Sequence, residues 1–241
     1  MSESAAVASV PDRPPHPVPA PVPPAPAASP AARRGTVQVA VFCGARAGAR
    51  GDYVEFAAAL GAGLAARGAG LVYGAGSVGV MGSVAAAARA GGARVVGVIP
   101  ASLFERERPS STGEELVVVR TMHDRKALMY RLSDAFIGLP GGLGTLDELM
   151  EVATWSQLGL HAKPVVLLDV AGYFRPLLAA LDHAVAEGFV SAADRALITV
   201  AETVGEALDL IAPARGHEDD RAVEAGRGLA AAPFTPNGRT R

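Results

Sequence analysis

From Thr36 onward, short runs of β-branched and apolar residues alternate with alanine-rich stretches of helical length. Continuous apolar runs are typical of strands in a parallel sheet, because helices cover both of its faces. The runs predict strands at 37–43, 70–74, 94–100, 115–122, 135–140 and 165–170. The stretches between them predict helices at 53–67, 80–90, 124–132, 145–158 and 173–187. This alternation predicts an α/β protein built on a doubly wound parallel sheet.

The same pattern predicts one Rossmann-like domain at 36–212, in which 196–200 adds an edge element and 204–211 a closing helix. Ten of the 18 prolines lie between Pro11 and Pro30, so 1–35 is interpreted as a disordered tail rich in proline and alanine. A ligand for the aromatic groove of a partner is the alternative. Beyond Pro213 the periodicity is lost, and 213–241 is predicted to be a second disordered tail.

Composition and charge exclude several classes of protein. With 22 basic and 24 acidic side chains, the net charge of −2 provides no general field for nucleic acid or an anionic membrane. No run reaches the roughly 18 apolar residues that a membrane-spanning helix needs. The first nine residues lack the features of a secretory signal, and the single cysteine, Cys43, has no partner for a disulfide or a cysteine-based zinc site. We therefore expect a cytoplasmic protein without a metal.

A first glycine-rich turn follows the strand predicted at 70–74. Gly74, Gly76 and Gly79 satisfy the G-x-G-x-x-G pattern of dinucleotide-binding proteins, between a strand and a helix as that pattern requires. Those proteins also need an acidic residue at the end of the next strand to hold the ribose hydroxyls. Here the next strand ends at Pro100, so the sequence does not favour a dinucleotide site.

A second glycine-rich turn, P-G-G-L-G-T-L-D-E at 140–148, also follows a strand and opens a helix. Glycines let backbone N–H groups approach an anion, and the start of a helix adds unpaired donors and partial positive charge. Thr145 can add a hydroxyl donor. Because no lysine follows the glycines as in a P-loop, the turn indicates a monophosphate rather than a triphosphate with magnesium.

Three other features have competing interpretations. Thr145 and Glu148 have the spacing of a capping box, so Glu148 is either a helix cap or a carboxylate placed beside the phosphate turn. The run M-H-D-R-K at 122–126 is either a solvated helix start or a cationic patch for a phosphorylated substrate. Cys43 is interpreted as a small buried side chain, because no activating neighbour is visible.

Together these motifs resemble the LOG (Lonely Guy) family of cytokinin riboside 5′-monophosphate phosphoribohydrolases, whose older members were often labelled lysine decarboxylases. The resemblance covers about 37–211, including V-Y-G-A-G-S at 72–77, M-H-D-R-K, the P-G-G-x-G-T-x-x-E signature, and W-S-Q-L-G-L-H-A-K-P at 155–164. It implies that Arg125 and Glu148 are the catalytic pair. It also implies substrate contacts from Gly76, Ser77, Met122, Lys126, Gly141, Gly142, Gly144 and Thr145. The family usually has serine after Gly44, where this chain has Ala45.

The resemblance further implies a homodimer with sites near the subunit interface and 155–164 in that interface. The implied reaction is hydrolysis of the N-glycosidic bond of AMP or a cytokinin riboside monophosphate, without a cofactor. A non-catalytic nucleotide-binding or carrier protein of the same fold is the alternative. A decarboxylase would need a lysine for pyridoxal phosphate, and neither Lys126 nor Lys163 lies in a recognisable motif for that cofactor.

Overall fold

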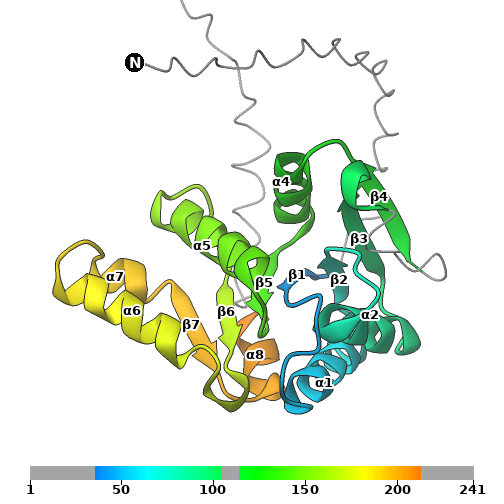
Figure 1. Cartoon of the computed structure of the whole chain (residues 1–241), viewed down its shortest axis with the longest axis horizontal. Coiled ribbons are helices and arrows are strands. Elements are labelled where there is room, and N and C mark those ends of the chain that lie inside the picture. The colour runs from blue at the N-terminus through cyan, green and yellow to red at the C-terminus, as the bar shows by residue number, and fades with distance from the viewer. Residues whose placement is uncertain (1–35, 105–113, 213–241) are drawn as a thin grey trace, which may run out of the picture. The chain divides into compact units, whose positions relative to one another are not determined.

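The computed structural model describes residues 36–104 and 114–212, all of which belong to one compact unit that begins at Thr36 (Figure 1). The tails predicted at 1–35 and 213–241 lie outside the described residues. Within the described ranges, no helix is both long and apolar enough to cross a membrane.

Seven strands form one sheet in the order β4-β3-β2-β1-β5-β6-β7, and every neighbouring pair is parallel. Their bounds are β1 Gln38–Phe42, β2 Gly70–Tyr73, β3 Val95–Pro100, β4 Glu115–Val119, β5 Ala135–Gly138, β6 Val165–Leu168 and β7 Ile198–Ala201. The predicted α/β class and the parallel sheet are therefore confirmed. The final strand is an edge strand, as the sequence indicates.

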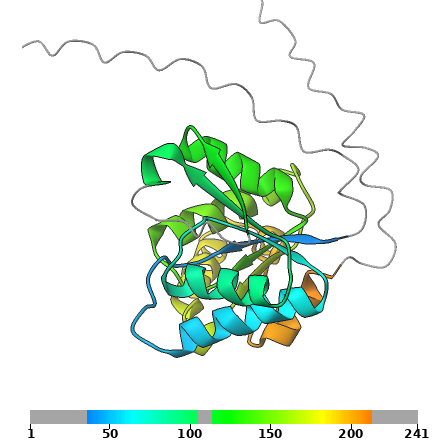
Figure 2. The same cartoon turned by 90° about the vertical axis from the view of Figure 1, so that its right-hand side faces the viewer.

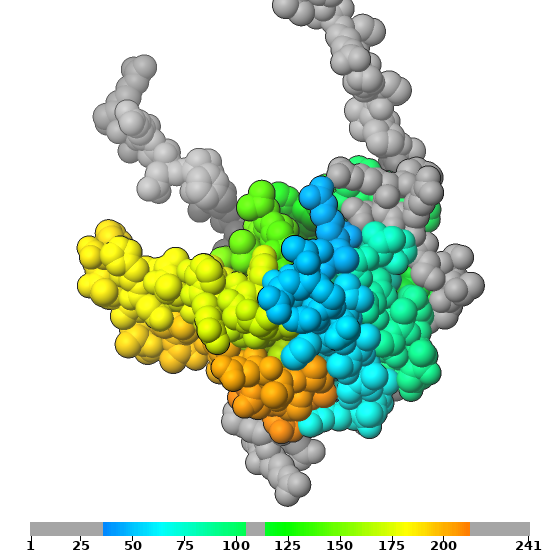
Figure 3. All heavy atoms as spheres, turned by 60° about the horizontal axis from the view of Figure 1, so that its bottom comes forward, coloured from blue at the N-terminus to red at the C-terminus, as the bar shows by residue number. Residues whose placement is uncertain are grey.

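Helices cover both faces of the sheet (Figures 1 and 2). One layer contains α1 (Asp52–Ala66), α2 (Gly79–Ala90) and α8 (Val204–Leu210), and the other contains α4 (Met122–Leu132), α5 (Leu143–Gln157) and α6 (Arg175–Ala186). The shorter helices are α7 (Ala192–Arg195), η2 (Ala101–Leu103) and η3 (Val170–Gly172). Figure 3 shows α8 in orange beside α1 in blue.

Alternate side chains of each strand enter two separate cores, as the period of a strand requires. On β1, Val39 and Val41 pack with α1, α2 and α8, whereas Ala40 and Phe42 pack with α4, α5 and α6. Both sets are almost completely buried. This two-sided burial explains why the strands are continuous apolar runs in the sequence.

The start of α4 differs from the sequence prediction. The strand predicted at 115–122 ends at Val119, and α4 begins at Met122 rather than at 124. Thr121 and Asp124 form a capping box, in which the Thr121 hydroxyl accepts from the Asp124 N–H and the Asp124 carboxylate accepts from the Thr121 N–H. This local cap stops the strand and begins the helix earlier than the apolar pattern suggests.

The strand order reverses beside β1. The chain moves outward from β1 through β2 and β3 to β4, and then returns to place β5 on the other side of β1. The loops after β1 and β5 therefore lead to opposite faces of the sheet from its carboxyl edge, where open parallel sheets bind ligands. At their starts the two loops are joined by a hydrogen bond from the N–H of Gly44 to the carbonyl of Pro140 at 3.1 Å.

Candidate active site

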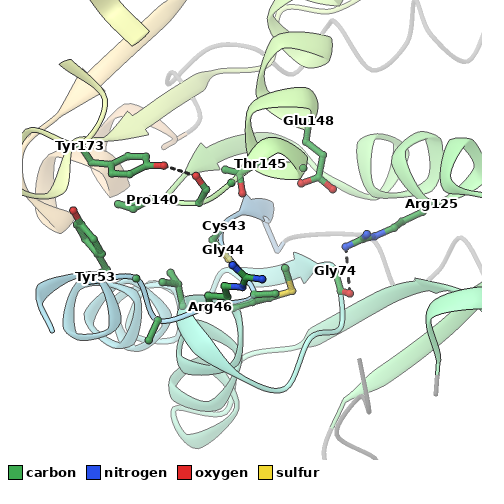
Figure 4. A pocket seen from close by; sticks show the side chains of 18 residues that line it. Cys43, Gly44, Arg46, Tyr53, Gly74, Arg125, Pro140, Thr145, Glu148 and Tyr173 are labelled. Atoms are coloured by element: carbon green, nitrogen blue, oxygen red, sulfur yellow. Dashed lines mark hydrogen bonds between the residues drawn. The ribbon is translucent and has the colours of Figure 1, made fainter. Parts of the chain in front are cut away.

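A cavity of about 460 Å³ lies at this reversal of strand order (Figure 4). Its wall comes from the β1–α1 loop, the start of α2, one side chain of α4, the β5–α5 turn and the segment before α6. The volume is within the range of small-ligand sites. Six residues proposed from the sequence line it: Arg125, Gly141, Gly142, Gly144, Thr145 and Glu148.

The N-terminus of α5 opens into this cavity without a side-chain cap. Its N-cap is Gly142, which has extended backbone and no side chain to accept from the first N–H groups. The starts of α4 and α8 differ, because threonine capping boxes occupy them. A Cβ atom on Gly142 or Gly144 would meet no described atom within 4 Å, so this turn has room for a ligand. The open helix start is suited to an anion.

Gly141 is closely surrounded by other atoms, whereas Gly142 and Gly144 are not. A Cβ atom on Gly141 would overlap the hydroxyl oxygen of Thr145 and lie 2.7 Å from the nitrogen of Gly44, so this position requires glycine. The hydroxyl of Tyr173 donates a hydrogen bond to the carbonyl of Gly141. Because C=O and N–H point in opposite directions across a peptide plane, this bond also orients the N–H of Gly142.

Arg125 extends from α4 toward the end of β2. Its Nη2 donates to the carbonyl of Gly74 at 3.3 Å, and its Nη1 lies 3.6 Å from the sulfur of Met122. A Cβ atom on Gly74 would overlap Nη2, so glycine at that position makes room for the guanidinium. The buried Nε has no hydrogen-bond partner among the described residues. One donor of Arg125 is therefore left unsatisfied by the described residues.

Glu148 lies on α5, and its carboxyl points toward the same space as Arg125 (Figure 4). Burial raises the pKa of Glu148 to about 7, while the positive charge of Arg125 acts to lower it. Within the described residues, the two side chains do not form an ion pair. A carboxyl with a pKa near neutrality can exchange protons at physiological pH, as general acid–base chemistry requires.

The capping interpretation of Glu148 is wrong. The prediction placed the helix start at Thr145, but α5 begins at Leu143 with Gly142 as its N-cap. Thr145 is thus already inside the helix, and its side chain is buried against Gly141. Glu148 consequently lies in the second turn rather than the first, where it is too far along the helix to cap it.

Four other residues proposed from the sequence do not belong to the cavity lining: Gly76, Ser77, Met122 and Lys126. Met122 is 42% exposed. Lys126 joins α4 to α5 through ion pairs with Asp147 at 3.0 Å and Glu151 at 3.1 Å. Their contact with substrate stays a prediction.

The first glycine-rich turn packs against the protein's own backbone. The N–H of Met81 donates to the carbonyl of Gly44 at 3.0 Å, and that of Val80 donates to the carbonyl of Arg46 at 3.4 Å. Gly79 has a φ of +66°, and a Cβ atom there would lie 2.6 Å from the carbonyl carbon of Arg46. Donors at the start of α2 are thus used to hold the β1–α1 loop, so fewer of them are available to a ligand than the G-x-G-x-x-G pattern suggests.

Several cavity residues carry no strong signal in the sequence. Arg46, Tyr53 and Tyr173 line the cavity, and the two tyrosine rings meet edge to face with centroids 5.7 Å apart. They come from segments without a motif, and only the fold brings them together. Cys43 also lines the cavity, and burial raises the pKa of its thiol, which favours the protonated form.

Neither of the chain's two lysines fits a pyridoxal phosphate site. Lys126 is held by two carboxylates, and Lys163 donates to the carbonyl of Tyr130 at 3.2 Å with its ammonium 3.9 Å from the centroid of the Tyr130 ring. Both lie outside the cavity lining. A Schiff base in this cavity would therefore have no lysine to form it.

The parallel sheet, the cavity at its reversal of strand order and the uncapped helix start define a Rossmann-like α/β protein with a site suited to a phosphorylated ligand. A family described as "Possible lysine decarboxylase" matches residues 81–211. The chain is 51% identical over 181 residues to the probable cytokinin riboside 5′-monophosphate phosphoribohydrolase LOGL1 of Oryza sativa subsp. japonica, covering 75% of this chain and 80% of that protein. The chain belongs to this LOG family.

A second relative is the cytokinin riboside 5′-monophosphate phosphoribohydrolase LOG3 of Arabidopsis thaliana, 50% identical over 169 residues, which are 70% of this chain and 79% of that protein. Among solved structures, the molybdenum cofactor binding protein of Rippkaea orientalis aligns with a TM-score of 0.56 and 22% identity, covering 74% of this chain and 96% of that one. The latter similarity concerns the fold.

Proposed function

We propose that this protein is an enzyme that hydrolyses the N-glycosidic bond of purine nucleoside 5′-monophosphates, releasing the free base and ribose 5-phosphate. One observation carries the proposal: an uncapped helix start, a guanidinium and a carboxyl with a pKa near 7 share one cavity. The relatives named as phosphoribohydrolases, at about half identity, support the same reaction.

The phosphoryl group is assigned to the N-terminus of α5, where the glycine turn and Thr145 line the cavity and no side chain caps the helix. This assignment leaves the ribose near Glu148 on α5 and Arg125 on α4, which lie to one side of Thr145 in the same cavity (Figure 4). Gly141, Gly142 and Gly144 then serve as the backbone cradle of the phosphate.

Cleavage of the C1′–N bond develops positive charge on the ribose, which an ionised Glu148 stabilises. The oxygen of a water molecule bonds to C1′ while the electron pair of the breaking bond passes to the base. Glu148 accepts the proton that the water loses, and the departing base gains a proton from solvent. Arg125 stays protonated throughout, so its role is electrostatic.

The test is direct. Purified protein is incubated with AMP and, separately, with isopentenyladenosine 5′-monophosphate, and free base and ribose 5-phosphate are measured by chromatography. We expect both products in equal amounts, with Glu148→Gln retaining nucleotide binding but losing at least about 100-fold in kcat. Tight binding of both nucleotides without any release of base would instead identify a carrier. Comparison of kcat/KM for the two nucleotides determines the base preference.

We further propose that the protein works in the cytoplasm as a homodimer. An apolar surface at the carboxyl ends of α4 and α5 supports the dimer, because Leu158 and Leu160 are 65% and 61% exposed there. Leu160 helps to line a shallow hollow there, together with Tyr130 and Trp155. Exposed apolar surface of this kind is typical of subunit interfaces.

A further inference from the structure

The charges of the cavity leave one cation without an assigned role. Of the described residues that line it, only Arg46, Arg125 and Glu148 carry a full charge. Arg125 donates a hydrogen bond to the carbonyl of Gly74, and its positive charge acts to lower the pKa of Glu148. With Glu148 ionised, these two charges offset each other. A phosphate dianion therefore finds its net positive partner in Arg46.

The backbone of Arg46 is held in a defined position. Its carbonyl accepts from the N–H of Val80, and the neighbouring carbonyl of Gly44 accepts from the N–H of Met81. On the other side, the N–H of Gly44 donates to the carbonyl of Pro140, so the loop is joined directly to the phosphate turn. The backbone of Arg46 is thus anchored to the start of α2, in a loop that Gly44 joins to the phosphate turn.

The side chain of Arg46 has no polar partner among the described residues. It forms no hydrogen bond or ion pair with any described residue. Figure 4 shows its guanidinium directed into the cavity, on the side of Thr145. The preceding residue, Ala45, has no donor in its side chain. The loop therefore offers the phosphate a guanidinium.

We propose that Arg46 binds the phosphoryl group of the substrate from the wall opposite the α5 N-terminus and makes the site selective for phosphorylated over unphosphorylated ligands. This inference rests on the proposed function. A guanidinium binds a phosphate through two parallel N–H···O bonds, whereas the amides of the glycine turn supply neutral donors. The two walls together surround the phosphate with a charged donor and a helix dipole.

The test uses direct binding of ribose 5-phosphate, the reaction product, so that it does not depend on turnover. Isothermal titration calorimetry compares the wild type with Arg46→Ala, Arg46→Lys and the control Arg50→Ala. Arg50 is exposed in the same loop, pairs with Asp52 and does not line the cavity. We expect Arg46→Ala to weaken binding by about 10- to 100-fold, Arg46→Lys to restore part of it, and Arg50→Ala to match the wild type.

Kinetics add a second readout. Arg46→Ala should raise KM for AMP by a similar factor with kcat nearly unchanged, and binding of adenosine should not change. If Arg46→Ala binds ribose 5-phosphate within about twofold of the wild type, the inference is overturned while the hydrolase proposal stands. If the wild type releases no base but Arg46→Ala still loses affinity for ribose 5-phosphate, the hydrolase proposal fails and the role of Arg46 stands.

Discussion

At the scale of single residues, Glu148 shows a conflict between stability and function. Its carboxyl has a pKa near 7 because burial disfavours the charged form, and no described cation forms an ion pair with it. A glutamine of the same shape would avoid this cost. Retaining an acid at this position is therefore destabilising in a neutral solution, which is typical of residues that are kept for their chemistry.

Replacement of Glu148 by glutamine should stabilise the protein in a pH-dependent way. The folded carboxyl keeps its proton up to about pH 7, whereas the unfolded one loses it near 4.5, so the wild type loses stability as pH rises between these values. We expect Glu148→Gln to gain on the order of 1–3 kcal/mol over the wild type at pH 8 and almost nothing at pH 4.5.

Urea denaturation at the two pH values measures this difference. The exposed Glu187, at the end of α6, provides a control, because Glu187→Gln should shift stability little at either pH. A gain from Glu148→Gln that is equal at pH 4.5 and pH 8 would contradict the buried, proton-exchanging state of the carboxyl.

At the scale of elements, the sequence predicts the strands and helices well because their apolar runs reflect two-sided burial. It misplaces the start of α4, which the Thr121 capping box sets, and the start of α5, which begins after Gly142 without a side-chain cap. The four-residue α7 is missed because it is too short to show periodicity.

The glycine turns are visible in sequence, but which of them has room for a ligand depends on the tertiary structure. Donors of α2 are used by the β1–α1 loop, while the start of α5 has no side-chain cap and its glycine turn lines the cavity.

Gly74 shows how one such turn serves the site indirectly. In Gly74→Ala, the new methyl group would occupy the position of the Arg125 guanidinium, which must move away. Because Arg125 is assigned to stabilising charge during bond cleavage, we expect kcat for AMP to fall at least about 10-fold with a smaller change in KM.

The matched control is Gly205→Ala on α8, where the nearest described atom to a new Cβ is the Thr203 hydroxyl oxygen at 3.9 Å. That change should leave kcat unaltered and add up to about 1 kcal/mol of stability, because alanine favours a helix. Steady-state kinetics and thermal denaturation of both variants separate an effect on Arg125 from a general loss of fold. Normal kcat in Gly74→Ala would remove Arg125 from the reaction.

At the scale of the whole molecule, residues that are distant in sequence make the site, and only part of it could be predicted. Arg125, Glu148 and the glycines of the β5–α5 turn belong to recognisable motifs. Arg46, Tyr53 and Tyr173 belong to none, because a single side chain on a loop or at the start of a helix leaves no periodic signal. Their recruitment depends on the strand order, which brings the loop after β1 beside the turn after β5.

The proposed dimer is tested at this scale. Leu160→Asp places a charge on the apolar surface beside Trp155, and we expect it to convert the dimer to a monomer at micromolar concentration, as measured by sedimentation velocity. Leu210→Asp on α8 is the control, because Leu210 is also partly exposed but lies on the opposite helical layer. A wild type that sediments as a monomer, or a Leu160→Asp variant that remains dimeric, would argue against this surface as the interface.

The hydrogen bond between Gly44 and Pro140 has a wider consequence. It joins the loop after β1 to the turn after β5, where the strand order reverses. A ligand held by both segments would link β1–β4 to β5–β7. Ligand binding would then raise the free energy of unfolding of the whole domain, because separating the two groups of strands also requires release of the ligand. A nucleotide bound in this position would therefore stabilise the fold as well as serve as the substrate.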